Sequence, residues 1–256
     1  MVESVARRQR EPGDLTGSTP NFRPLYVQVK DLLIQRMVRG DWGPGEPLPT
    51  ETALAEEFQV SHGTVRKALD KLAAENLVVR QQGRGTFVVS HTPQRALFHF
   101  FHMVGKDGSR RLPDSRLLSC ERAPASVAEQ GKLDLPAGAE VLRIHRVRTL
   151  DGEPAIIESI VLAADTFPGL GDPSGEELPN ALYQLYEEQY GVTIYRAVEH
   201  LGAVNADTGE AGLLGVEAGT ALLEIDRVAA GLDGKPVEWR VSRCHTGAIH
   251  YLNALD

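Results

Sequence analysis

The chain has 256 residues, of which 42% are hydrophobic and 24% are charged, so it is long enough for two domains with separate cores. Its net charge of -8 argues against a protein that binds nucleic acid along its whole length. Two cysteines far apart in sequence, Cys120 and Cys244, exclude a disulfide framework and favour a reducing cytoplasm.

The charge is unevenly distributed. Residues 1–92 carry 12 lysines and arginines against 11 aspartates and glutamates, whereas the remaining residues carry 15 against 24. The acidity therefore belongs to the second part, and the first part is compatible with a nucleic-acid partner. Nowhere do eighteen apolar residues run together, and no apolar stretch follows Arg7, Arg8 and Arg10, so we expect a cytoplasmic protein with no membrane partner.

The first elements in chain order are a flexible polar leader over residues 1–21 and a helix from Pro24 to about Gly40. Thr50 then provides an N-cap for a short helix, and Ser61 provides a second N-cap after a turn too short for an antiparallel pair. This spacing is typical of a helix-turn-helix.

The second helix of this pair, about Ser61 to Glu75, has one apolar face and one polar face. Val65, Leu69 and Leu72 form the apolar face, so polar side chains in the first two turns are free to enter a major groove. Residues 77–80 and 86–89 are expected to be two strands around the tip Gln82-Gly83-Arg84-Gly85, which would form a wing.

Several motifs in this stretch match a known family: Leu48-Pro49-Thr50-Glu51, Thr64-Val65-Arg66 and Gln82-Gly83-Arg84-Gly85-Thr86-Phe87-Val88. They resemble the winged helix-turn-helix of the GntR transcriptional regulators over residues 22–90. The resemblance implies that these residues contact duplex DNA: Thr50, Thr52, Ser61, His62, Gly63, Thr64, Arg66, Gln82, Gly83 and Arg84.

Roles within this set differ. Arg66 is expected to contact phosphate or guanine, and Arg84 the minor groove or backbone, the alternative being solvated surface charges. Thr52 and His62 stand where the family often has arginines. For these two positions, contact with DNA and an idle surface position both stand.

After a linker over residues 91–96, the second domain contains an internal echo. Leu135–Gly138, the strand Val141–Val147 and the turn at Asp151-Gly152 recur as Val216–Gly219, Leu222–Val228 and Asp233-Gly234. Two related strand-turn-strand units are implied. With helices at residues 177–190 and 205–214 and strands at residues 193–201, 237–244 and 249–255, we predict an α+β fold with a largely antiparallel sheet.

Two arginines share one face of the first strand of this echo. Alternation places Arg146 and Arg148 on the same side as Leu142 and Ile144, where a guanidinium group needs a carboxylate or an anionic ligand. A two-residue turn at Asp151-Gly152 sets Arg146 opposite Ile157, whereas a three-residue loop or a bulge sets it opposite Glu158. The sequence leaves this register open.

Other motifs of the second domain, Ser115–Ser119, Arg146-Val147-Arg148, Asp151–Pro154, Leu182-Tyr183 and Pro236-Val237-Glu238, resemble the UTRA effector domain of the HutC subfamily, whose fold is similar to chorismate lyase. This implies a pocket in which Arg146 and Arg148 hold an anion, with Glu158 and Glu238 as polar partners. The alternative is a structural network of salt bridges. Ala181 and Cys244 replace a serine and a tyrosine of members that bind phosphorylated sugars, so a smaller carboxylate is an equal candidate.

We therefore expect an N-terminal winged helix-turn-helix domain (residues 22–90) and a C-terminal UTRA domain for ligand binding and dimerisation (residues 97–256). The function predicted is a homodimeric repressor whose affinity for operator DNA responds to a small anionic effector. The alternatives are a lyase-like enzyme acting on a small organic acid and a regulator whose second domain only dimerises. We expect no catalytic residues because nucleophile and zinc motifs are missing from the sequence. His91, His99 and His102 have no completing carboxylate motif, so we expect no metal and no cofactor.

Overall fold

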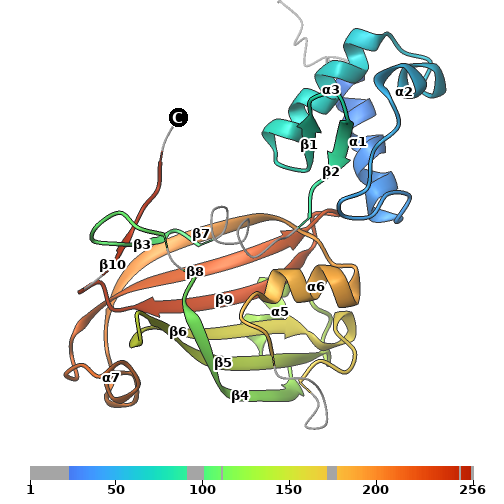
Figure 1. Cartoon of the computed structure of the whole chain (residues 1–256). Helices are drawn as coiled ribbons and strands as arrows, with labels where there is room; N and C mark the ends of the chain where they lie inside the picture. The colour runs from blue at the N-terminus through green and yellow to red at the C-terminus, as the bar shows by residue number, and fades with distance from the viewer. Residues whose placement is uncertain (1–22, 91–100, 111, 172–177, 248, 255–256) are drawn as a thin grey trace, which may run out of the picture.

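The computed structural model of the chain describes residues 23–90, 101–110, 112–171, 178–247 and 249–254, and it consists of a small helical domain beside a larger domain built on one sheet (Figure 1). The predicted leader, residues 1–21, and the predicted linker, residues 91–96, lie outside the described residues. Among the described helices, none combines the length and the apolar character needed to cross a membrane.

The small domain contains three helices and a hairpin: α1 (Leu25–Val38), α2 (Glu51–Glu57), α3 (His62–Ala74), β1 (Val78–Gln81) and β2 (Gly85–Val88). Thr50 and Ser61 cap α2 and α3, each accepting a hydrogen bond of 3.2 Å from the backbone N–H three residues later. The apolar faces of α1, α2 and α3 share one core that includes Leu33, Leu54 and Leu69. The two strands are shifted by one residue from their predicted positions.

The large domain is a six-stranded antiparallel sheet with the order β4-β5-β6-β9-β8-β7. Its strands are β4 (Asp114–Pro124), β5 (Glu140–Leu150), β6 (Glu153–Ala163), β7 (Ile194–Asn205), β8 (Ala221–Gly231) and β9 (Pro236–Cys244). The prediction of an α+β fold with an antiparallel sheet is confirmed. The sequence echo corresponds to the hairpins β5-β6 and β8-β9, which meet at the centre of the sheet through β6 and β9.

The echo is larger than the sequence indicated. Each hairpin is preceded by an edge strand and a short helix, α5 (Val127–Leu133) after β4 and α7 (Thr208–Leu214) after β7. The sheet is therefore made of two similar halves, β4-α5-β5-β6 and β7-α7-β8-β9, arranged about the β6-β9 pair. The sequence analysis predicted neither β4 nor α5. For β4 the reason is that it is an edge strand with mostly exposed residues and no clear alternation.

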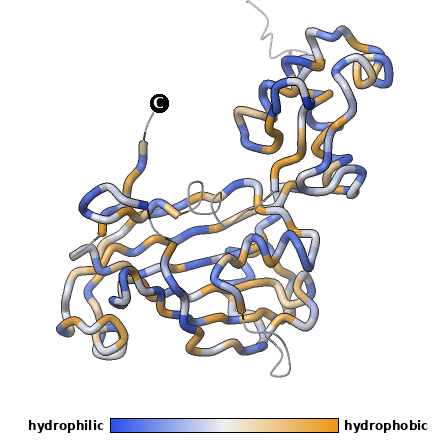
Figure 2. Tube along the Cα trace, in the orientation of Figure 1, coloured by the Kyte–Doolittle hydropathy of each residue, from blue (hydrophilic) through white to orange (hydrophobic). Residues whose placement is uncertain are grey.

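Helices cover both faces of the sheet. The helix α6 (Leu182–Tyr190) and the 3₁₀ turn η1 (Ala164–Thr166) pack over one face, where Ile144, Ile160 and Tyr186 are fully buried. The helices α5 and α7 pack against the other face through separate small clusters. Figure 2 shows the hydrophobic and hydrophilic residues that alternate along the strands as a result. A two-stranded ribbon of β3 (Met103–Gly105) and β10 (Ile249–Tyr251) completes the domain.

Four predicted boundaries in this domain were wrong. The helix predicted at residues 177–190 begins at Leu182, with Ala181 as its N-cap. The helix predicted from residue 205 begins at Thr208, since Asn205 is still paired in β7 and Asp207 is the N-cap. The strand predicted at residues 193–201 extends to Asn205, and the last strand ends at Tyr251.

The register that the sequence left open is resolved by a bulge. The β5-β6 hairpin starts with Leu150 opposite Glu153 across the two-residue turn, and an irregularity between Arg148 and Thr149 then shifts the pairing by one residue. Arg146 consequently lies opposite Glu158. The two side chains share the face of the sheet that α6 covers.

The two domains contact each other at the end of α3. The Tyr195 hydroxyl at the start of β7 donates a 2.7 Å hydrogen bond to Glu75, the residue that caps the C-terminus of α3. Lys30 of α1 forms an ion pair with the same carboxylate. Tyr195 and Leu232 also pack against the core of the small domain.

Candidate functional site

The predicted DNA-reading residues lie together on the surface of the small domain. All of them are exposed except Thr64, which is half-buried. The Thr50 and Ser61 hydroxyls are occupied as helix caps, and Ser61 also shares a 2.9 Å hydrogen bond with the Thr64 hydroxyl. Thr52 and His62 are exposed in the first turns of α2 and α3.

Arg66 is held by a glutamate of the preceding helix. Its Nε lies 3.1 Å from Glu51 Oε2, while Arg80 Nη2 lies 3.2 Å from Glu51 Oε1 and 2.9 Å from Asp70 Oδ1. We name Glu51, Arg66 and Arg80 the Glu51 cluster. Arg80, which was not among the predicted residues, joins the wing strand β1 to both helices of the helix-turn-helix, and Glu51 connects it to Arg66.

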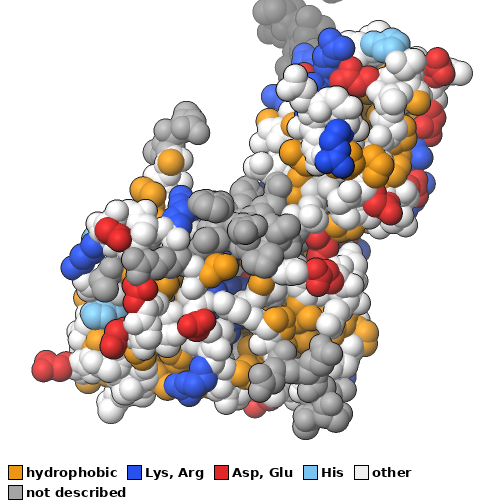
Figure 3. All heavy atoms as spheres, viewed as in Figure 1, with side chains coloured by type: hydrophobic (Ala, Val, Ile, Leu, Met, Phe, Trp, Pro, Cys, Tyr) orange, Lys and Arg blue, Asp and Glu red, His pale blue; other side chains and the backbone are white. Residues whose placement is uncertain are grey.

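The predicted wing is present as the β1-β2 hairpin. Gln82, Gly83 and Arg84 form its exposed tip, and Gly83 adopts a positive φ of 72° that favours glycine. Arg84 extends along the hairpin with its guanidinium carbon 5.8 Å from the Phe87 ring. In Figure 3, basic side chains gather on the end of this domain farthest from the sheet, with acidic side chains between them.

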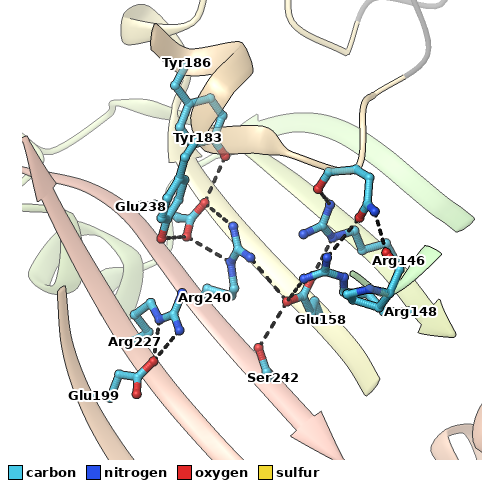
Figure 4. Close-up of polar contacts among 12 residues, drawn as sticks. Arg146, Arg148, Glu158, Tyr183, Tyr186, Glu199, Arg227, Glu238, Arg240 and Ser242 are labelled. Carbon is cyan, nitrogen blue, oxygen red and sulfur yellow. Dashed lines mark hydrogen bonds and ion pairs between the residues drawn. The ribbon is translucent and has the colours of Figure 1, made fainter. Parts of the chain in front are cut away.

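A cavity of about 70 Å³ lies on the α6 face of the sheet. Residues of six strands, of the segment before β3 and of the start of α6 line it. The polar lining is Arg146, Arg148, Glu158, Asn180, Arg227, Arg240 and Ser242, and the apolar lining includes Phe101, Met103, Ile156, Ile225 and Cys244. Three of the four residues predicted for effector binding, Arg146, Arg148 and Glu158, therefore meet at one cavity (Figure 4).

Glu158 is the centre of the charged side of this cavity. Its Oε2 accepts a 2.5 Å hydrogen bond from Arg146 Nε, and its Oε1 lies 3.2 Å from Arg240 Nη1 and 3.6 Å from Arg148 Nη1. We name these four residues the Glu158 cluster. Burial raises the pKa of Glu158, but the three arginines outweigh it and hold that pKa well below its usual range. The carboxylate is thus ionised throughout the physiological range of pH.

Glu238 does not take the predicted position beside the ligand. It is fully buried under α6, outside the cavity lining, where both oxygens accept hydrogen bonds from Tyr183, Tyr186 and Arg240. It acts on the cavity through Arg240, whose guanidinium group it holds in a bidentate pair (Figure 4). Glu238 lies four positions before Ser242 on β9, with Arg240 between them on the same face of the sheet.

Arg148 differs from the other arginines of the cavity. Its Nη2 donates a 2.9 Å hydrogen bond to Asn180 Oδ1, and its guanidinium carbon lies 5.0 Å from the centre of the Phe101 ring. Its Nε is the one buried side-chain nitrogen or oxygen among the described residues that has no hydrogen-bond partner. Burial lowers the pKa of Arg148 to about 10, so the group remains charged at neutral pH.

Two further arginines were missed by the sequence analysis. Arg240 pairs with Glu158 and Glu238, and Arg227 forms an ion pair with Glu199, whose other oxygen accepts a hydrogen bond from Tyr251. A signal for Arg227 was available, because the sequence echo aligns it with Arg146. Arg240 is aligned with Glu158 in the same way, and the two side chains meet across the β6-β9 pair.

The first turn of α6 adds backbone donors to the cavity. Ala181 is its N-cap and supplies no side-chain hydrogen bond, and residues 180–183 line the cavity. Uncapped N–H groups at the start of a helix favour an anion. Among the described residues no group of three histidine, cysteine, aspartate or glutamate side chains could hold a metal ion.

Known proteins resemble this chain in both domains. Residues 25–88 match the model of the bacterial regulatory proteins of the gntR family, and residues 109–250 match the model of the UTRA domain. The transcriptional regulator YurK of Bacillus subtilis is 30% identical over 89% of this chain and 94% of its own length. The repressor NagR of the same organism is 31% identical over 91% of this chain and 96% of its own length.

Solved structures agree with these matches. The ligand-binding domain of a GntR-family regulator from Bordetella bronchiseptica is 33% identical and aligns with a TM-score of 0.56 over 60% of this chain and 96% of its own. PhnF from Mycobacterium smegmatis, 27% identical, aligns with a TM-score of 0.54 over 88% of this chain and 98% of its own. These relatives are transcriptional regulators, which removes the enzyme alternative. The chain belongs to the GntR family of bacterial transcriptional regulators, in the HutC subfamily that carries a UTRA domain.

Proposed function

We propose that this regulator is a repressor that binds operator DNA through α3 and the wing and is controlled by a small anion bound in the cavity of the UTRA domain. The DNA contacts proposed are Thr50, Thr52, Ser61, His62, Gly63, Thr64, Arg66, Gln82, Gly83 and Arg84. The effector contacts proposed are Arg146, Arg148 and Glu158, with Glu238 acting through Arg240. Residues 22–90 serve as the DNA-reading domain and residues 97–256 as the effector domain.

The observation that carries the effector part is the unsatisfied Nε of Arg148. A buried guanidinium nitrogen without a partner costs about 1–3 kcal/mol. Arg148 lines the cavity, so an anion bound there would remove that cost once the side chain turns this nitrogen towards it. In a UTRA domain that only dimerises, no ligand would compensate for the cost of this unpaired donor. This alternative is therefore disfavoured, and it predicts that replacing Arg148 leaves every response to small molecules unchanged.

Repression and dimerisation have separate support. Relatives named as repressors include NagR and the mannosyl-D-glycerate system repressor MngR of Escherichia coli. The edge strand β7 exposes half of the side-chain surface of Val198 and of Leu201, which a second copy would cover. A homodimer in the cytoplasm would present two α3 helices to the half-sites of a near-palindromic operator. Sedimentation equilibrium should give the mass of two chains.

Operator binding is tested by fluorescence anisotropy with DNA from upstream of the chain's own gene. We expect binding at least 1,000-fold tighter than to random duplex of equal length. Arg66→Ala should weaken operator binding about 10- to 100-fold, because it removes a base or phosphate contact and leaves the fold intact. Lys71→Gln, an exposed change in the last turn of the same helix, is the matched control and should have little effect. Equal affinity for operator and random duplex would defeat the proposal.

A further inference from the structure

We infer that the effector is a small monocarboxylic acid with a short apolar body, whose carboxylate binds Arg148. The inference rests on the proposed function and names the chemical class for its site. A phosphorylated sugar, the other candidate, differs from such an acid in charge, in hydroxyl groups and in size. The cavity distinguishes the two on each of these properties.

The first argument is charge balance. Four arginines line the cavity, Arg146, Arg148, Arg227 and Arg240, and three carboxylates among the described residues neutralise them: Glu158, Glu199 and Glu238. One positive charge remains. His102 also lines the cavity, but burial lowers its pKa, so it adds no charge at neutral pH. A single carboxylate balances the site, whereas a phosphate dianion would leave a buried negative charge.

The second argument concerns hydrogen-bond acceptors. A sugar needs acceptors for its hydroxyl groups, but the carboxylate oxygens of Glu158, Glu199 and Glu238 already accept from protein donors. The Asn180 side-chain oxygen accepts from Arg148. Sugar hydroxyls would therefore compete with these protein donors for the acceptors of the cavity. A carboxylate needs donors instead, and Arg148 Nε and the first turn of α6 offer them.

The third argument is the apolar part of the lining. Met103, Ile156, Ile225 and Cys244 belong to one hydrophobic cluster and line the cavity together. Burial raises the pKa of Cys244 to about 12, so this thiol is neutral and part of the apolar surface. The volume of about 70 Å³ holds roughly five to seven water molecules, because each needs about 10–15 Å³. An acid with a body of a few carbon atoms fits these limits.

Isothermal titration of the full chain at pH 8 tests the class with three probes that share one branched body: isovalerate, isovaleramide and isobutyl phosphate. At this pH the phosphate ester is a dianion and the amide is neutral. We expect isovalerate to bind at least tenfold more tightly than either. Arg148→Met should weaken isovalerate binding about 10- to 100-fold, which is the effect of a lost charge-assisted hydrogen bond.

Two variants keep this test interpretable. Arg122→Gln removes an exposed arginine of β4 that pairs with Glu140 at the surface, and it should bind isovalerate as the wild type does. Arg148→Lys keeps the charge without the Nε donor, so it should also bind more weakly and serves if Arg148→Met does not fold. Isobutyl phosphate or isovaleramide binding as tightly as isovalerate would overturn the inference. Isovalerate that does not bind, or that binds Arg148→Met unchanged, would overturn it too.

Release of operator DNA by the same probes, together with glucose 6-phosphate, separates this inference from the proposed function. Release by either phosphate ester without release by isovalerate means that the chemical class is wrong and effector control stands. Binding of isovalerate at Arg148 that leaves operator affinity unchanged means that the class is right and effector control fails. Release by isovalerate, lost in Arg148→Met, supports both.

Discussion

Each domain contains a glutamate that bridges arginines from several elements, and the two clusters differ mainly in their access to water. In the Glu51 cluster the side chains of Arg66 and Glu51 are 64% and 26% exposed. In the Glu158 cluster the side chains of Arg146 and Glu158 are each 4% exposed. The same chemical groups are therefore used at the surface in the DNA-reading domain and in the interior in the effector domain.

This difference in exposure determines what each cluster can do. An exposed ion pair contributes about 0–1 kcal/mol, so Arg66 can exchange Glu51 for a DNA phosphate or base at little cost. A buried pair cannot exchange partners in this way, because separating its members leaves an uncompensated charge. Among the described residues, the buried side-chain donor without a partner is Arg148 Nε, and this is where we propose that the ligand of the effector domain binds.

The largest expected effect comes from neutralising the buried glutamate. Glu158→Gln leaves Arg146, Arg148 and Arg240 without their common counter-charge, and we expect the free energy of unfolding of the effector domain to fall by about 3–5 kcal/mol. Each domain holds one tryptophan, Trp42 in the small domain and Trp239 in the large one. Urea denaturation in a Trp42→Phe background therefore follows the effector domain by fluorescence.

The matched change in the other cluster is Glu51→Gln, measured in a Trp239→Phe background. It removes the carboxylate shared by Arg66 and Arg80 at the surface, so the DNA-reading domain should lose less than about 1 kcal/mol. Similar losses for Glu158→Gln and Glu51→Gln would mean that exposure does not separate the two clusters.

The sequence predicted the helix caps beside the Glu51 cluster more reliably than it predicted the ion pairs of the Glu158 cluster. Thr50 and Ser61 act on backbone groups three residues away, so their capping roles were readable from the sequence. Alternation along one strand placed Arg146 and Arg148 on the correct face. The pairing of Arg146 with Glu158, however, depends on a bulge between Arg148 and Thr149, and no residue type at these positions predicts a bulge.

Contacts between distant strands were outside the reach of local patterns. Arg240 meets Glu158 because β6 and β9 pair at the centre of the sheet, across 82 positions of sequence. The position of Glu238 under α6, where it holds Arg240, depends on the same strand pairing and could not be predicted from local patterns. The sequence echo did contain the information for Arg227, since it aligns that residue with Arg146.

The ion pair of Glu129 with Arg143 is intermediate in exposure between the two clusters, and its contribution to stability depends on pH. Glu129 of α5 is buried and its partner Arg143 is 25% exposed. The hydrogen bonds from Arg143, with those from Ser126, lower the pKa of Glu129 to about 2. A lowered pKa stabilises the fold above the unfolded value near 4.5, and this contribution is lost as the pH falls towards 2.

The change that tests this case is Glu129→Gln. It should flatten the dependence of the unfolding free energy on pH between about 4.5 and 2, by at most about 1.4 kcal/mol per pH unit. Solvent around Arg143 screens the pair and keeps the effect below this ceiling. Glu121→Gln, which removes an exposed carboxylate 3.8 Å from the same arginine, is the matched control. An equal change of slope in both variants would assign the effect to overall charge.

The last comparison concerns the contact that joins the two domains, where we expect an effect well below that of Glu158→Gln. Tyr195→Phe removes the hydroxyl that donates to Glu75 and keeps the ring that packs on the small domain. The pKa of Glu75 is lowered by its hydrogen bonds to Lys30 and Tyr195, which outweigh the effect of burial, so the acceptor is a carboxylate at neutral pH. A double-mutant cycle of Tyr195→Phe with Glu75→Gln should give a coupling of about 0.5–1.5 kcal/mol in the unfolding free energy. The same cycle with Glu57→Gln, whose carboxylate pairs with Arg36, should give no coupling. Equal coupling in the two cycles would mean that this contact does not hold the domains together in solution, and that α3 is positioned relative to β7 by apolar packing alone.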